Sequence, residues 1–174
     1  DLLTEFDVLT SSNWVTIGPL SLAGRDLPVL DDTNSWLAND GLKVMITFGS
    51  LPVPNAEIII ETAVNAYLRL GCNVMVNMYG FKPTRIMSYK HSGVLTQHDI
   101  GLITDKLLIV EKLNYNIVLP QIDIIFCHGG SGTIHSAIYN QCVLHIHPIF
   151  GDQMLWGKMV AVKNIGGYNN KVFS

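Results

Sequence analysis

The segment 122–133, IDIIFCHGGSGT, holds residues whose types and spacing could do chemistry. An apolar run enters a glycine-rich turn that leaves room for a ligand near the backbone, through Gly129, Gly130 and Gly132. The first amides of a following helix carry partial positive charge, Thr133 adds a hydroxyl, and His128 can donate from a ring nitrogen. The segment matches neither a Walker A motif nor GxGxxG. It predicts a diphosphate cradle; the alternative is a tight turn that needs glycines only.

Two further segments offer polar groups at similar junctions. In 148–153, PIFGDQ, the adjacent Asp152 and Gln153 supply acceptors and a donor that suit the hydroxyls of a sugar. The alternative for Asp152 is simple capping of the helix that follows. In 48–50, FGS, Ser50 supplies a hydroxyl after a glycine turn.

Apolar runs that alternate with helical patterns must position these segments. Strands are predicted at 43–48, 73–79, 107–111, 122–127 and 143–147. Helices are predicted between Asn55, as N-cap, and Gly71, as C-cap, and over 133–140 and 152–163. This alternation indicates an α/β fold with a doubly wound parallel sheet. Ligands of such sheets bind beyond the carboxyl ends of the strands, where all three segments fall. The stretch 80–105 has no clear pattern.

Composition narrows the class of protein. The 174 residues are 48% hydrophobic and 14% charged, which is typical of one globular domain. A net charge of −3 argues against nucleic-acid binding. The three cysteines, Cys72, Cys127 and Cys142, have no CxxC spacing, which favours a reducing compartment, and no apolar run is long enough for a membrane span. We therefore expect a cytoplasmic location.

Metal binding is the weaker interpretation of the histidines. His145 and His147 alternate on a predicted strand, but no third ligand is evident, and polar groups near a strand end are the simpler interpretation. No DxD carboxylate motif occurs. Trp156 has the spacing of a core residue, and His91, His98 and His135 have no assigned role.

The three segments together resemble the signature of GT-B glycosyltransferases, and most closely that of sterol and lipid glucosyltransferases. FGS at 48–50, HGGSGT at 128–133 and PIFGDQMLW at 148–156 are similar to the family's FGS, HHGGxGT and PFFGDQxFW. The resemblance extends over about 14–167 and implies the C-terminal, donor-binding half of a GT-B fold. It implies that the diphosphate is held by Ser50, His128, Gly130, Gly132 and Thr133. It implies that Asp152 and Gln153 hold sugar hydroxyls.

The sequence departs from the family at three places. Cys127 stands where many members have a second histidine. Ile117 stands where many have a tryptophan that stacks on uracil, with Tyr115 nearby as a substitute, so these two are the nucleoside-binding candidates. Ser136 stands where plant-type relatives have a glutamate for the ribose.

The resemblance implies inverting transfer of a hexose, glucose from UDP-glucose, to a sterol or lipid hydroxyl, with no cofactor and no metal. The catalytic base is expected in an N-terminal acceptor-binding domain. Because the chain begins at Asp1, we expect 1–174 to be one nucleotide-sugar-binding domain of a longer protein, with 1–40 a linker and first helix. Any peripheral membrane attachment would lie in other parts of that protein. The fragment alone is expected to be inactive. The alternatives are a donor-binding subunit that needs a partner chain, a non-catalytic nucleotide-sugar sensor, and a nucleotide-sugar epimerase of the same fold.

Overall fold

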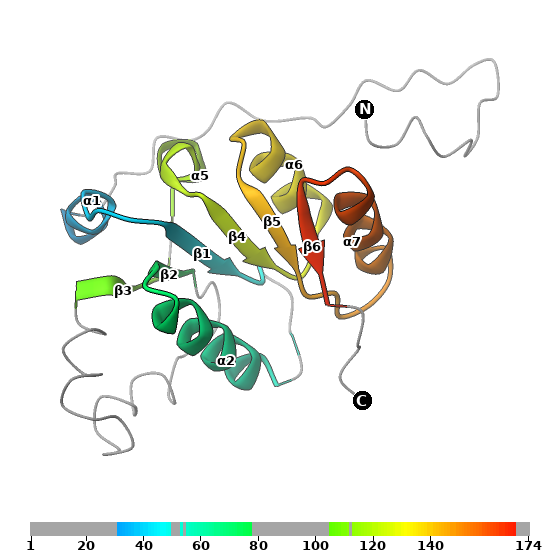
Figure 1. Cartoon of the computed structure of the whole chain (residues 1–174), viewed down its shortest axis with the longest axis horizontal. Coiled ribbons are helices and arrows are strands. Elements are labelled where there is room, and N and C mark those ends of the chain that lie inside the picture. The colour runs from blue at the N-terminus through cyan, green and yellow to red at the C-terminus, as the bar shows by residue number, and fades with distance from the viewer. Residues whose placement is uncertain (1–30, 50–52, 54, 78–104, 112, 170–174) are drawn as a thin grey trace.

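The structure of the chain, a computed structural model, describes residues 31–49, 53, 55–77, 105–111 and 113–169. Its centre is a six-stranded sheet in which every neighbouring pair is parallel (Figure 1). The order across the sheet is β3-β2-β1-β4-β5-β6. The strands are β1 (Lys43–Thr47), β2 (Asn73–Asn77), β3 (Leu107–Val110), β4 (Ile124–Cys127), β5 (Val143–Ile146) and β6 (Gly166–Tyr168).

Helices cover both faces of this sheet. They are α1 (Asp31–Leu37), α2 (Ala56–Arg69), α5 (Tyr115–Val118), α6 (Ser131–Tyr139) and α7 (Gln153–Val162), with a 3-10 helix, η1 (Leu119–Gln121). The apolar side of α2 packs on one face, and α1, α5, α6 and α7 pack on the other (Figure 1). The domain therefore has three layers, with the sheet in the middle.

The sequence of β1 explains how one strand serves both layers. Val44 and Ile46 join the cluster under α2, whereas Met45 between them joins the cluster under α6 and α7. All three side chains are completely buried. A continuous apolar run is what a parallel strand needs when helices cover both of its sides. The same alternation in β2 places Val74 and Val76 opposite Met75.

The strand order places the topological switch point of the sheet between β1 and β4. From β1 the chain moves outward to β2 and β3, and from β4 it moves outward in the other direction to β5 and β6. The loops that follow β1 and β4 therefore leave the sheet on opposite sides. This is the strand order of dinucleotide-binding doubly wound folds, whose ligands bind at such a switch point.

The doubly wound parallel sheet predicted from the sequence is confirmed, as are its five predicted strands and three predicted helices. Helix α6 begins at Ser131, two residues before the predicted start, because Gly130 is its extended N-cap residue. Asn55 is the N-cap residue of α2, as predicted, although its backbone is left-handed (φ 56°) and its side chain makes no cap hydrogen bond. The C-cap residue of α2 is Leu70 rather than the predicted Gly71, which follows it with φ 83°.

Three elements were not predicted. Strand β6 is only Gly166, Gly167 and Tyr168, which offers no alternation of apolar and polar residues. Helix α5 and η1 are too short for a helical period to be visible. Nearly all of 80–105 lies outside the described residues. Among the helices that are described, none has the length and apolar character needed to cross a membrane.

Candidate functional site

Phe48, after β1, and His128, after β4, meet at the switch point. Their rings are stacked, with centroids 6.2 Å apart and planes at 29°. His128 is 8% exposed, so the loop after β4 begins inside the molecule rather than on its surface. The predicted ligand Ser50 lies outside the described residues, although Gly49 before it is described and has φ 60°.

The turn after β4 needs two glycines for different reasons. Gly129 has φ 93°, and a Cβ there would lie 2.9 Å from Ile146 Cγ2. A Cβ on Gly130 would lie 2.6 Å from His128 Nε2. The backbone therefore passes close to both the sheet and the imidazole, which larger residues would prevent.

Helix α6 begins directly at this turn. Its N-cap residue is Gly130, which has no side chain that could cap the first amides. Ser131 and Gly132 are exposed, and Thr133 is half-buried on the first turn. The predicted diphosphate ligands His128, Gly130, Gly132 and Thr133 thus lie within one strand-to-helix turn. The arrangement can hold an anion through amides and a hydroxyl.

The environment of His128 favours a neutral imidazole. Burial lowers its pKa, and the negative charge of Asp152 acts in the opposite direction. Nδ1 is buried, and within the described part of the chain it has no hydrogen-bond partner. A buried polar atom left without a partner is costly, on the order of 1–3 kcal/mol. A ligand that supplies a partner would remove that cost.

The two residues predicted to bind the sugar, Asp152 and Gln153, lie where the loop after β5 meets α7, and they differ in burial. Gln153 is buried, and its Oε1 accepts hydrogen bonds from the amides of Ile149 (2.8 Å) and Phe150 (3.1 Å). Its carbonyl oxygen therefore holds the loop in shape, and its amide nitrogen is the group suited to a ligand. Asp152 is exposed and makes no cap bond to α7, although it occupies the N-cap position. Its Oδ2 accepts instead from Trp156 Nε1 at 2.9 Å.

The two nucleoside-binding candidates, Tyr115 and Ile117, lie in different surroundings. The hydroxyl of Tyr115 lies 3.1 Å from Thr47 Oγ1 and accepts from Asn77 Nδ2 at 3.2 Å, at the carboxyl ends of β1 and β2. Burial raises the pKa of Tyr115, so the phenol stays protonated. Ile117, two residues on, is 42% exposed and does not belong to this hydrogen-bonded cluster. Sequence reasoning missed Thr47 and Asn77, although each is a polar residue that ends an apolar strand.

The remaining histidines have other surroundings. His145 and His147 both face Phe126, with centroid distances of 4.8 and 6.0 Å, and Tyr67 Oη lies 2.7 Å from His145 Nδ1. Burial lowers the pKa of each. Within the described ranges, no three His, Cys, Asp or Glu side chains gather as metal ligands. His91 and His98 lie outside the described residues.

Cys127, which replaces the family's second histidine, is fully buried at the end of β4. Burial raises the pKa of its thiol to about 12, so it is uncharged and offers no anion-binding donor of the histidine type. All three cysteines are free and buried, so none is paired in a disulfide. Ser136 is half-buried on α6, where its carbonyl accepts from Asn140 Nδ2.

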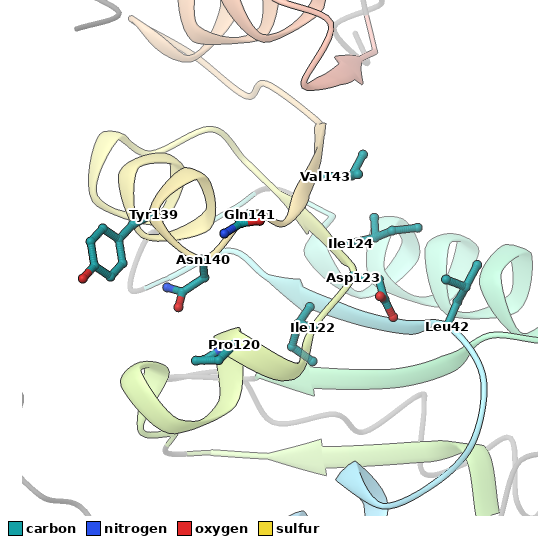
Figure 2. Close-up of a pocket in the computed structure, with 9 residues that line it drawn as sticks. All are labelled: Leu42, Pro120, Ile122, Asp123, Ile124, Tyr139, Asn140, Gln141 and Val143. Carbon is teal, nitrogen blue, oxygen red and sulfur yellow. The ribbon is translucent and has the colours of Figure 1, made fainter.

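A hollow of about 670 Å³ lies at the other end of the strands, where β1, β4 and β5 begin (Figure 2). It is lined by the segments before β1, β4 and β5 and by the end of α6, including Leu42, Tyr139 and Val143. Its carboxylate, Asp123, already accepts the amide of Lys43 at 2.7 Å. None of the predicted site residues lines it, so it is separate from the candidate site at the carboxyl ends of the strands.

Comparisons with known proteins agree with the motifs. No protein-family model matches the sequence. A sterol 3-beta-glucosyltransferase of Arabidopsis thaliana is 27% identical over 131 residues, which are 75% of this chain and 18% of the relative. A sterol 3-beta-glucosyltransferase of Cryptococcus neoformans is 25% identical over 123 residues, 71% of this chain and 8% of the relative. The chain thus spans less than a fifth of these curated relatives.

Solved structures share the fold. UDP-glucose: anthocyanidin 3-O-glucosyltransferase in complex with UDP superposes with a TM-score of 0.61 at 16% identity, covering 82% of this chain and 31% of that one. The spinosyn forosaminyltransferase superposes with a TM-score of 0.60 at 18% identity, covering 84% and 34%. The motifs, the sequence relatives and the fold together support the resemblance of this chain to the donor-binding domain of GT-B glycosyltransferases of the sterol and lipid UDP-glucosyltransferase type.

Proposed function

We propose that this chain binds the UDP-sugar donor of an inverting glycosyltransferase that moves a hexose, glucose from UDP-glucose, to a sterol or lipid hydroxyl. One observation carries the proposal: the HGGSGT turn lies at the β1–β4 switch point, with a glycine as the N-cap of its helix and a buried His128 Nδ1 that has no partner among the described residues. The sterol 3-beta-glucosyltransferases among its sequence relatives support the choice of substrates.

In this proposal the glycine turn stabilises the leaving diphosphate. Negative charge grows on the diphosphate as the bond to the sugar breaks. Preorganised amides at the start of α6 and the Thr133 hydroxyl meet that charge without reorganisation. His128 adds a hydrogen bond from a ring nitrogen. We expect these groups to act without a divalent cation, so that UDP binding is unchanged by EDTA.

Asp152 and Gln153 are proposed to distinguish the sugar nucleotide from the nucleotide. Oδ1 of Asp152 would accept from sugar hydroxyls, and Nε2 of Gln153 would donate to one. Hydrogen bonds of this kind select a hydroxylated ligand because the analogue lacking the hydroxyl leaves site groups unpaired. The nucleoside would lie near Tyr115, on the β1–β2 side of the same edge.

The acceptor and the catalytic base are proposed to belong to another domain. Transfer needs an acceptor hydroxyl in line with the anomeric carbon and a base within about 2.6–3.2 Å of it. Positioning of that kind accounts for roughly 7–11 kcal/mol of barrier lowering. We therefore expect this chain to bind the donor and to form no glycolipid from radiolabelled UDP-glucose and a sterol or lipid extract. Robust product formation by the chain alone would refute this division of labour.

Calorimetric titration of the purified chain tests donor binding directly. UDP-glucose should bind more tightly than TDP-glucose, UDP-GlcNAc and GDP-mannose. Absence of binding by all four would refute the proposal. The second candidate, a non-catalytic nucleotide sensor, is favoured by the internal partners that already occupy Asp152 Oδ2 and Gln153 Oε1. A sensor of this kind would bind UDP and UDP-glucose equally.

A further inference from the structure

We infer that Trp156 is a positioning residue, which fixes the carboxylate of Asp152 toward the sugar of the bound donor. The inference rests on the proposed function, in which Asp152 binds sugar hydroxyls. Its basis is the hydrogen bond from Trp156 Nε1 to Asp152 Oδ2, at 2.9 Å. This bond joins a buried ring to an exposed carboxylate.

The two partners differ in freedom of movement. Trp156 is 5% exposed and belongs to the core cluster under α7, as its spacing predicted, so its N–H direction is set by packing. Asp152 is exposed, and its side chain could otherwise turn to cap α7, which it does not do. A hydrogen bond to a charged group is stronger than one between neutral groups. The indole therefore decides where the carboxylate lies, and no described residue donates to its Oδ1.

The indole is itself supported from the diphosphate turn. His135 on α6 packs against it, with ring centroids 5.3 Å apart and planes at 79°. Nδ1 of His135 lies 2.8 Å from the carbonyl oxygen of Ser131, the first residue of α6, so this nitrogen donates. A continuous series of contacts thus joins the turn after β4 to the loop after β5, through Ser131, His135, Trp156 and Asp152. A ligand that contacts both loops would find Asp152 held at a set position relative to α6.

The substitution Trp156→Phe removes the N–H and keeps an aromatic ring in the core. We expect it to weaken UDP-glucose binding roughly tenfold, the size of a hydrogen bond to a charged group. UDP binding should change by less than about twofold, because UDP makes no use of Asp152. Calorimetry with both ligands measures the ratio. A merely structural role would lower both affinities together, and equal losses would overturn the inference.

A double-mutant comparison separates this inference from the proposed function. If Trp156 acts through Asp152, then Trp156→Phe should have no further effect on UDP-glucose binding in an Asp152→Ala background. A sugar-specific loss in Asp152→Ala without one in Trp156→Phe would overturn the inference alone. No sugar-specific loss in Asp152→Ala would overturn the assignment of Asp152 and the inference with it.

The unsubstituted chain provides a measurement that does not depend on Trp156→Phe folding. The indole N–H resonance of Trp156 should shift when UDP-glucose is added, and should shift less with UDP at equal saturation. The resonance is assigned as the one that moves most in Asp152→Asn, with Trp36, whose Nε1 donates to the Lys106 carbonyl, as the internal control. Equal shifts with both ligands would overturn the inference.

Discussion

The turn after β4 and the loop after β5 both lie at the carboxyl ends of the strands, but they offer a ligand different kinds of group. The first presents backbone amides and an imidazole nitrogen that has no partner in the described structure. The second presents side chains that are already tied to the protein, Asp152 to an indole and Gln153 to two amides. An anion needs donors that are fixed and unoccupied, whereas a sugar needs several side-chain groups at set positions. We therefore expect the first loop to be sensitive to substitutions that change its backbone, and the second loop to substitutions that remove its side-chain groups.

The largest effect on stability should come from Gly129→Ala, which places a side chain where the backbone of the first loop has no room for one. The new Cβ would meet Ile146 Cγ2 at 2.9 Å on a residue with φ 93°. Left-handed strain of about 1–2 kcal/mol and overpacking of about 1–3 kcal/mol should together lower the free energy of unfolding by roughly 2–5 kcal/mol.

Urea denaturation checks this, with Gly132→Ala as the matched control. No atom lies within 4 Å of a Cβ at Gly132, and alanine favours a helix, so stability should be unchanged or higher. Equal stability of both variants would show that the turn tolerates side chains.

Removal of the imidazole tests the same loop by ligand binding. His128→Ala should weaken UDP binding about ten- to a hundredfold, since a hydrogen bond to a charged group contributes roughly 1.5–3 kcal/mol. His145→Ala, which removes a half-buried histidine from the next strand, should leave UDP affinity unchanged in the same titration. A folded His128→Ala protein with normal UDP affinity would place this histidine outside the site.

In the second loop, Gln153→Ala should affect both stability and sugar recognition. The amides of Ile149 and Phe150 would lose their acceptor, and because water can replace it at this half-open loop we expect a loss of about 1 kcal/mol of unfolding free energy. UDP-glucose binding should weaken more than UDP binding. Gln121→Ala, at an exposed glutamine, is the control and should change stability by less than about 0.5 kcal/mol. Unchanged stability of Gln153→Ala would contradict the role given to Oε1.

The smallest effect should be a dependence of stability on pH. Burial lowers the pKa values of His128, His145 and His147 in the folded chain below the ordinary value of 6.5. Between 6.5 and these lower values the unfolded chain binds more protons, so the free energy of unfolding should fall as the pH is lowered through this range. Urea midpoints at several pH values below 7 measure the fall. The double substitution His145→Gln and His147→Gln should flatten the curve, and a curve that keeps its slope would exclude these two groups as its source.

Much of this fold follows from local sequence, and much of the site does not. Apolar runs such as 43–47 identify the strands because both of their sides are buried. The glycines around His128 identify the turn because only they permit its backbone. The cluster of Thr47, Asn77 and Tyr115 could not be predicted, because it depends on the register of β1 against β2 and on the position of a four-residue helix.

The bond between Asp152 and Trp156 is an intermediate case. Their spacing of four residues is visible in the sequence and places both on one side of a helix. The identity of Asp152 nevertheless favours a helix cap, since aspartate is common at that position. Only the burial of the indole in the core shows why the carboxylate turns away from the cap. Sequence patterns report the preference of each residue by itself, and this contact depends on tertiary packing.

The central position of β1 in the sheet has a consequence for folding. Lys43 and Asp123, which bond across the β1–β4 pair, are 80 residues apart in the chain. Pairing over such a separation is slow, because the entropy of closing the intervening chain is lost before the contacts form. The contact between Phe48 and His128 at the switch point exists only after β1 and β4 have paired. Recovery of UDP binding during refolding should therefore follow the slowest kinetic phase. The rate at which UDP binding returns would then report when β1 and β4 have paired.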